Sequence, residues 1–114
     1  FGHAIEAGLG FGVWLHGEAV GCGMVLAAHL SQRLGLVDAF FVHRLVTLIA
    51  KAGLPTKAPV LDSADNAGRY LALMQLDKKS EAGEIKFVLI DQPGRAVVRP
   101  APNALVRQVI DLSC

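Results

Sequence analysis

The sequence predicts a mainly α-helical fold, a single multi-helical domain over residues 1–114 with one small β-hairpin near the C-terminus. Three observations lead to this prediction. A length of 114 residues suits one domain. Apolar residues recur at helical spacing through most of the chain, and glycines and prolines interrupt that pattern where helices would end. Only residues 85–100 read as two short strands around a turn.

The first expected helix covers residues 1–9, with Phe1, Ile5 and Leu9 on one stripe. Neither Phe1 nor Gly2 offers a side-chain oxygen to the first amides of this helix, so we expect the true helix start to lie upstream. The glycines expected to end this helix are Gly8, Gly10 and Gly12.

A second helix is expected from about Gly17 to Leu34. Its predicted buried stripe consists of Val20, Met24, Ala27 or Ala28, and Leu30. Two interior glycines, Gly21 and Gly23, each cost about 1 kcal/mol relative to alanine. Close approach of another backbone or of a ligand can offset that cost. Cys22 lies in this apolar context and is expected to be a small buried hydrophobe.

Asp38 is the expected N-cap of a third helix that ends at Gly53. Its predicted inward face consists of Phe41, Leu45, Leu48 and Ile49. The prolines of "LPTKAP" make that segment a connector. Asp62 or Ser63 is expected to cap a fourth helix. The residues expected to point inward from it are Tyr70, Leu71, Leu73 and Met74.

The hairpin is expected where "IKFVLI" and "RAVVRP" flank "DQPG", which carries proline and glycine at turn positions. A last helix should run from about Pro102, a residue suited to a first turn, to Leu112. Its apolar stripe is Leu105, Val106, Val109 and Ile110.

Composition excludes several classes of function. The chain has 11 Lys and Arg against 10 Asp and Glu, without a basic stripe, so neither nucleic acid nor an anionic membrane is an expected partner.

No signal peptide is visible, and no apolar run reaches the ~20 residues of a membrane span. Cys22 and Cys114 form no disulfide framework, which favours the cytoplasm. The 53% hydrophobic content indicates either an alanine- and valine-rich core or a surface that meets another domain.

Two histidines are the first candidates for chemistry. His3 and His16 bracket a glycine-rich bend, and His16 stands at the start of the second helix. Two interpretations remain open from spacing alone: metal ligands, or histidines hydrogen-bonded within the structure. A zinc site needs at least three protein ligands, and no convincing third is present. His29 and His43 are expected to be solvated.

Charged residues near these histidines also have two interpretations each. Glu6 or Glu18 could orient a histidine that binds metal, or be solvated, or in the case of Glu18 favour the helix start. Lys78 and Lys79, in "LDKKS", could neutralise the end of the fourth helix. Alternatively, one of them could hold a phosphate or carboxylate in a cleft.

The stretch "FGHAIEAGLGFGVWLHGEAVGCGM" closely resembles the signature of the 3-dehydroquinate synthase family, "GHAIEA" followed by "LHGEAV" and a glycine–methionine pair. The later "DKK", the hairpin and the closing helix fit the same family, so the likeness covers essentially the whole chain. The resemblance implies that residues 1–114 are the C-terminal helical domain, which binds metal and substrate. It also implies an N-terminal NAD-binding domain that is absent from this chain.

The resemblance implies a lyase of the shikimate pathway. This family converts 3-deoxy-D-arabino-heptulosonate 7-phosphate to 3-dehydroquinate and phosphate, using NAD and zinc or another divalent metal such as cobalt. The implied partners are a phosphorylated sugar-acid substrate, the protein's own N-terminal domain and, in the full-length enzyme, a second subunit of a homodimer. The implied location is the cytoplasm.

Site residues follow from the same resemblance. His16 matches a metal ligand, the last of three zinc ligands in the family. His3 matches a catalytic residue near the substrate's phosphate. Lys79, with Lys78 as the alternative, matches a catalytic, substrate-binding lysine. The other two metal ligands would lie upstream of Phe1, so we expect the 114-residue chain alone to be inactive.

Other functions remain open. Another sugar-phosphate cyclase, such as a 2-deoxy-scyllo-inosose synthase, or a metal-dependent polyol dehydrogenase could share the fold. A helical interaction domain without catalysis is the alternative of a different class.

Overall fold

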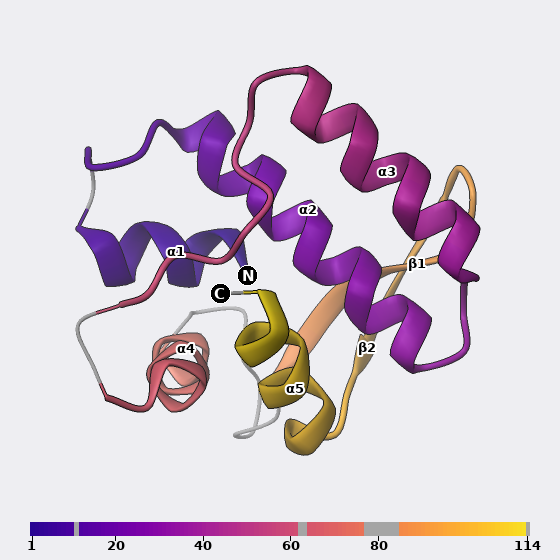
Figure 1. Cartoon of the computed structure of the whole chain (residues 1–114). Coiled ribbons are helices and arrows are strands. Elements are labelled where there is room, and N and C mark those ends of the chain that lie inside the picture. The colour runs from indigo at the N-terminus through magenta and orange to yellow at the C-terminus, as the bar shows by residue number, and fades with distance from the viewer. Residues whose placement is uncertain (11, 62–63, 77–84, 114) are drawn as a thin grey trace.

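The computed structural model, shown in Figure 1, describes residues 1–10, 12–61, 64–76 and 85–113. It confirms the mainly α-helical fold with one hairpin near the C-terminus. Its elements are α1 (Gly2–Leu9), α2 (His16–Arg33), α3 (Ala39–Lys51), α4 (Asn66–Gln75), β1 (Lys86–Gln92), β2 (Arg95–Pro100) and α5 (Asn103–Ser113). Over these ranges, every helix falls short of the length and apolarity that crossing a membrane requires.

Helix α2 is the centre of the fold. It contacts α1, α3, α5 and β1, and it runs through the middle of the molecule in Figure 1, while α4 packs on α1 and α5. The apolar residues that it buries are Ala19, Cys22, Val25, Leu26, Ala28 and Leu30. The expectation for Cys22 is confirmed, since its side chain is buried and its thiol donates to the carbonyl oxygen of Lys57 at 3.3 Å.

Part of the predicted α2 stripe is wrong. Val20 and Met24 are 40% and 47% exposed, whereas Leu30 is buried as expected. Two apolar stripes run along α2, and both have helical spacing. The positions of α1, α5 and β1 decide which of them is covered, and a single sequence does not carry that information.

Helices α1 and α2 come unusually close at two glycines. A Cβ atom on Gly23 would lie 2.9 Å from the backbone nitrogen of Gly2 and 3.2 Å from its Cα atom. A Cβ atom on Gly2 would lie 3.4 Å from the carbonyl oxygen of Ala19. The predicted close approach of another backbone at Gly23 is therefore confirmed. By contrast, Gly8 does not end α1, which continues to Leu9; Gly10, with a φ of 89°, ends it.

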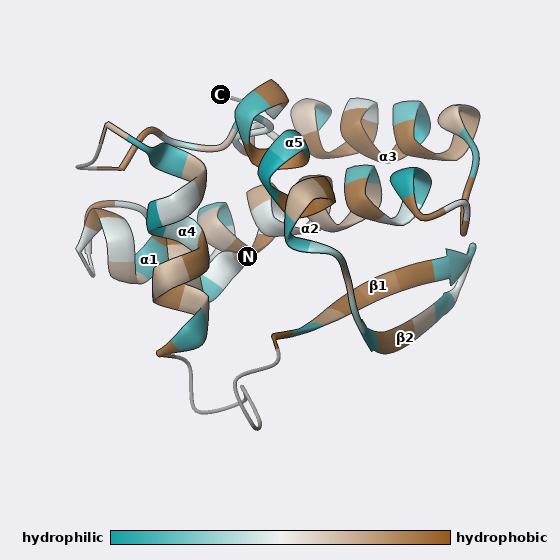
Figure 2. Cartoon of the chain, turned by 90° about the horizontal axis from the view of Figure 1, so that it is seen from below, coloured by the Kyte–Doolittle hydropathy of each residue, from teal (hydrophilic) through white to brown (hydrophobic). Residues whose placement is uncertain are grey.

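The hairpin packs on the core through β1, which contacts α2, and Figure 2 shows β1 as the more apolar strand. Phe87 and Leu89 are buried, as the alternation predicts. The strands pair antiparallel around Pro93 and Gly94, whose φ of 83° suits the third position of a type II turn. Ser31 joins α2 to β1: its buried hydroxyl accepts from the Ile90 amide at 3.0 Å and donates to the Ala27 carbonyl at 2.7 Å.

The remaining helices confirm most of their predicted boundaries. Asp38 caps α3 by accepting from the amide of Phe41 at 2.8 Å. Leu48, expected to point inward, is 69% exposed, and Val42 is buried in its place alongside the correctly predicted Ile49. On α5, Val106, Val109 and Ile110 are buried as predicted, with Leu105 half-buried.

Helix α4 starts later than expected. Its N-cap is Asp65, whose carboxylate accepts from the amide of Gly68 at 3.2 Å and pairs with Arg107 of α5 at 2.7 Å. The two predicted caps, Asp62 and Ser63, lie outside the described residues. The predicted inward residues Tyr70 and Met74 are buried, and Leu71 and Leu73 are half-buried.

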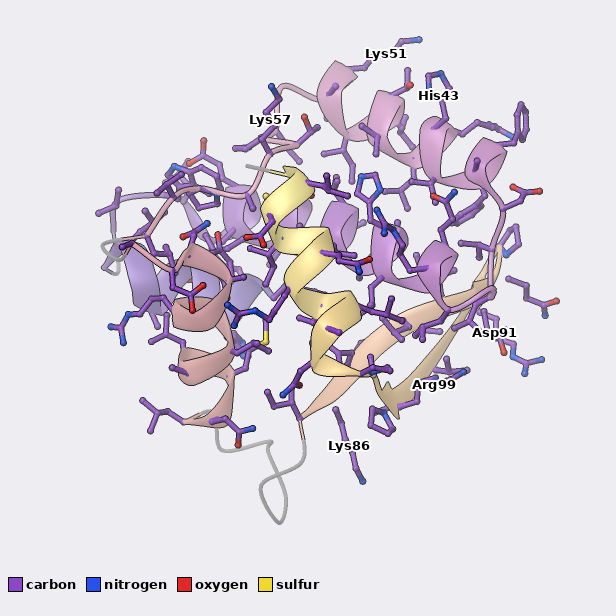
Figure 3. All side chains as sticks on the ribbon, turned by 60° about the horizontal axis from the view of Figure 1, so that its bottom comes forward. His43, Lys51, Lys57, Lys86, Asp91 and Arg99 are labelled. Atoms are coloured by element: carbon purple, nitrogen blue, oxygen red, sulfur yellow. The ribbon has the colours of Figure 1, made fainter. Side chains whose placement is uncertain are left out.

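His29 and His43, which the sequence analysis did not select as metal ligands, differ in environment. His43 is exposed on α3, as expected (Figure 3). His29 of α2 is half-buried instead of solvated. Burial, and then the nearby charge of Arg33, lower the pKa of His29 below its ordinary value of 6.5.

We predict that Gly23→Ala destabilises the protein by about 1–3 kcal/mol, because the new methyl group meets the backbone of Gly2. The matched control is Gly17→Ala in the same helix, where a Cβ atom would meet nothing within 4 Å. This control should be neutral or up to about 1 kcal/mol more stable. Urea denaturation measures both. Equal effects of the two substitutions would contradict the close crossing.

The lowered pKa of His29 predicts a pH dependence of stability. Protonation then favours the unfolded state, in which the ordinary pKa of 6.5 applies. The stabilising effect of a neutral His29 is complete above that value and declines as the pH falls below it. Chemical denaturation at several pH values should show a shallower decline for His29→Gln. His43→Gln, at the exposed surface of α3, is the control and should keep the wild-type dependence.

Candidate active site

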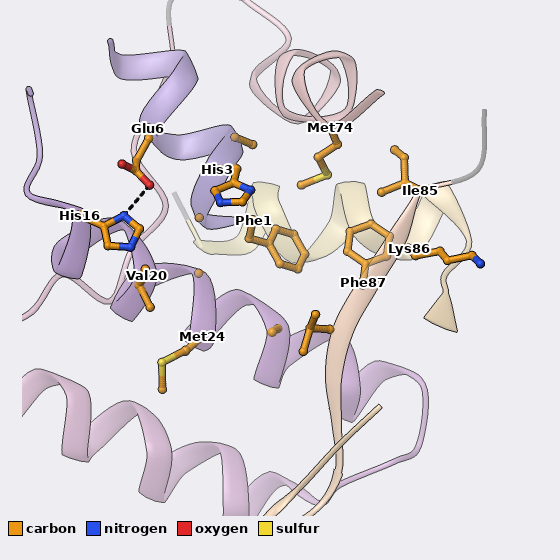
Figure 4. Close-up of a pocket in the computed structure, with 15 residues that line it drawn as sticks. Phe1, His3, Glu6, His16, Val20, Met24, Met74, Ile85, Lys86 and Phe87 are labelled. Atoms are coloured by element: carbon orange, nitrogen blue, oxygen red, sulfur yellow. Dashed lines mark hydrogen bonds and ion pairs between the residues drawn. The ribbon is translucent and has the colours of Figure 1, made fainter. Parts of the chain in front are cut away.

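A cavity of about 340 Å³ lies beside the crossing of α1 and α2. Its walls come from α1, from the first half of α2, from Met74 of α4 and from residues 85–88 (Figure 4). We call it the histidine cavity, because His3 and His16 both line it together with Glu6. The glycine-rich bend between α1 and α2 thus brings His3 and His16 to one cavity.

Helical spacing explains how α1 contributes to this cavity. His3 and Glu6 are three residues apart, which places both on one face of α1. His16 is the first residue of α2, beyond the glycine-rich bend. The Nδ1 atom of His16 lies 3.0 Å from the Oε1 atom of Glu6, as the dashed line in Figure 4 marks. The side chain of His16 is 71% exposed, whereas that of Glu6 is only 14% exposed.

The structure separates the roles of the two nearby carboxylates. Glu6 contacts the imidazole of His16. The Oε1 atom of Glu18 instead accepts from the backbone amide of Leu15 at 2.7 Å, at the start of α2. That bond is the reach-back half of a capping box, and a negative charge there also favours the helix start. Of the two interpretations of Glu18, the one that assigns it to the helix start fits these contacts.

Apolar side chains form the rest of the histidine cavity. The rings of Phe1 and Phe87 are 5.3 Å apart between centroids and tilted by 37°. Val20 and Met24, the α2 residues expected in the core, line the cavity, as does Met74. The cavity thus combines apolar walls with two solvent-exposed imidazoles and the carboxylate of Glu6.

The expected substrate lysines, Lys78 and Lys79, lie outside the described residues. Lys86, which the sequence analysis did not select, lines the histidine cavity at the start of β1. In Figure 4 its side chain extends away from His3 and His16. Strand alternation predicts an outward side chain for Lys86, which stands between the inward residues Ile85 and Phe87, so no signal in the sequence pointed to its place at the cavity.

His16 has the chemistry of a metal ligand. Histidines that bind metal commonly donate their other ring N–H to a carboxylate. The Nδ1 atom of His16 lies at hydrogen-bond distance from such a carboxylate, that of Glu6. Within residues 1–10, 12–61, 64–76 and 85–113, no three His, Cys, Asp or Glu side chains are grouped closely enough to hold a metal ion. The described residues therefore do not form a complete metal site by themselves.

Comparison with known structures supports this fold. A crystal structure of 2-deoxy-scyllo-inosose synthase, complexed with carbaglucose-6-phosphate, NAD+ and Co2+, matches with a TM-score of 0.76 and 24% sequence identity. The match covers 99% of this chain and 33% of that one, so the chain spans about a third of the length of that enzyme.

Comparison with protein families shows which family the chain belongs to. The family described as 3-dehydroquinate synthase C-terminal matches residues 1–80. The matched region contains α1 to α4, and with them both histidines and Glu6. This chain therefore belongs to the 3-dehydroquinate synthase C-terminal family.

Proposed function

We propose that this chain is the C-terminal domain of a 3-dehydroquinate synthase, which converts 3-deoxy-D-arabino-heptulosonate 7-phosphate to 3-dehydroquinate and phosphate. The observation that carries the proposal is the histidine cavity, which both histidines of the family signature line and where His16 is hydrogen-bonded to Glu6. In this proposal the domain acts with an N-terminal NAD-binding domain, in a cytoplasmic homodimer.

In this proposal each site residue would have a separate role. His16 would be a ligand of a divalent metal, zinc or cobalt, and its exposed ring is accessible for that role. His3, on the same wall, would lie near the substrate's phosphate and assist its departure. Lys79, or Lys78 in its place, would hold the substrate by its charge. When bound, NAD and the metal would supply reversible hydride transfer and polarisation of substrate hydroxyls.

The apolar wall would contribute by limiting water around the reacting groups. Phe1, Phe87 and Met74 line the side of the cavity that belongs to α1, β1 and α4. Fewer competing waters would strengthen the contacts of His3 and His16 with a charged substrate.

A second candidate function is the synthesis of 2-deoxy-scyllo-inosose. The structural match to that synthase, which holds a carba analogue of glucose 6-phosphate, supports this alternative. Both functions use a phosphorylated sugar or sugar acid, so the cavity alone favours neither. The match to the 3-dehydroquinate synthase family is the reason for placing the heptulosonate first.

Phosphate release tests the proposal. We predict that a longer protein containing this chain, with NAD and Co2+ or Zn2+ added, releases phosphate from the heptulosonate phosphate. His16→Ala should lower kcat/KM by at least about 100-fold, because it removes a proposed metal ligand. His43→Ala, at an exposed position on α3, is the control and should retain activity.

The 114-residue chain alone should release no phosphate. Turnover of glucose 6-phosphate in place of the heptulosonate would favour the inosose synthase. No phosphate release from either substrate by the longer protein would favour the non-catalytic helical domain.

A further inference from the structure

We propose that Glu6 is a positioning residue for His16. Its carboxylate holds the imidazole of His16 in the tautomer that presents Nε2 to a divalent metal ion. The inference rests on the proposed function in one respect, since that function makes His16 a metal ligand. The assignment of the tautomer depends only on the contact between the two side chains.

The first step concerns the proton on the imidazole. The Nδ1 atom of His16 and the Oε1 atom of Glu6 are 3.0 Å apart, which is hydrogen-bond distance. An ionised carboxylate only accepts hydrogen bonds, so the proton of a neutral His16 must reside on Nδ1. The lone pair of the ring is then on Nε2, the nitrogen that remains for a metal ion.

The second step concerns which partner holds the other. Glu6 is the more buried of the two, with 14% of its side chain exposed against 71% for His16. A largely buried carboxylate can orient an exposed ring, whereas the reverse is less effective. Free histidine in water favours the opposite tautomer, so without Glu6 the nitrogen nearer the backbone would carry the lone pair.

The third step concerns rigidity, because a positioning contact requires that both of its ends be held. Glu6 belongs to α1, whose N-terminal end meets α2 at the contact between Gly2 and Gly23. His16 is the first residue of α2, a helix start that Glu18 closes by accepting from the amide of Leu15. The two side chains therefore meet between helix segments that other contacts hold in place.

The tautomer can be measured without metal. We expect the nitrogen chemical shifts of 15N-histidine-labelled, metal-free protein at about pH 8 to place the proton of His16 on Nδ1. Glu6→Ala should move the population toward the Nε2-protonated form. Glu18→Gln removes the same charge nearby, keeps a capping oxygen and should leave the tautomer unchanged. If His16 has the same tautomer with and without the Glu6 carboxylate, the inference is wrong.

Metal affinity of the longer protein that contains this chain provides the second readout, by titration with Co2+ or Zn2+. Glu6→Ala should weaken binding by about 10- to 100-fold, the usual effect of losing a partner of a ligating histidine. Glu6→Gln, which retains an oxygen in a side chain of the same shape, should cause a smaller loss, and Glu18→Gln a change within about twofold. Equal affinity of Glu6→Ala and wild-type protein would overturn the inference.

A double variant separates positioning from general structural damage. If Glu6 acts through His16, adding Glu6→Ala to His16→Ala should weaken metal binding no further than His16→Ala alone. A further loss would show that Glu6 acts elsewhere and would refute the positioning role. Metal binding by His16→Ala equal to that of wild-type protein would refute the proposed metal function, while the tautomer of metal-free protein would still decide the role of Glu6.

Discussion

The contact between Gly2 and Gly23 determines how the rest of this domain can be arranged. A side chain at position 23 would meet the backbone of α1, so the two helices can lie this close only with glycine there. This distance brings the inner face of α1 onto the first turns of α2. Glu6 then reaches His16, and His3 lines the same cavity one helical turn away. The apparent helix-propensity cost of glycine within α2 is thus offset by packing that also shapes the site.

Local sequence signals were sufficient for most of the fold. Helical spacing, the Asp38 cap and the Pro93–Gly94 turn each act within a few residues of the chain, so their outcomes could be predicted. The same holds for the buried face of β1, where Phe87 and Leu89 alternate with exposed residues. The roles expected for His3 and His16 came from the family resemblance, because spacing alone left both metal binding and structural hydrogen bonding open.

Predictions failed at positions whose burial or contacts depend on an element that is distant in the sequence. Val20, Met24 and Leu48 have helical spacing on apolar stripes, yet no neighbouring element covers them fully. Asp65 caps α4, and Arg107 of α5 binds the same carboxylate and lowers its pKa. These outcomes depend on where α5, β1 and α1 pack, and the residues of one helix do not encode those positions.

The choice between Glu6 and Glu18 illustrates the same limit within the site. Glu18 lies near His16 in the same helix, and Glu6 lies across the bend from it. The sequence alone does not say which of the two contacts the imidazole. Glu18 is two residues from His16 on the same helix, so its side chain can reach back to the amide of Leu15 but faces away from a ring two positions earlier. Glu6 is ten residues away along the chain, and only the crossing of α1 over α2 brings it to the imidazole. The carboxylate that is distant in sequence is therefore the one that can orient His16, the proposed metal ligand, and the nearer one stabilises the helix that carries it.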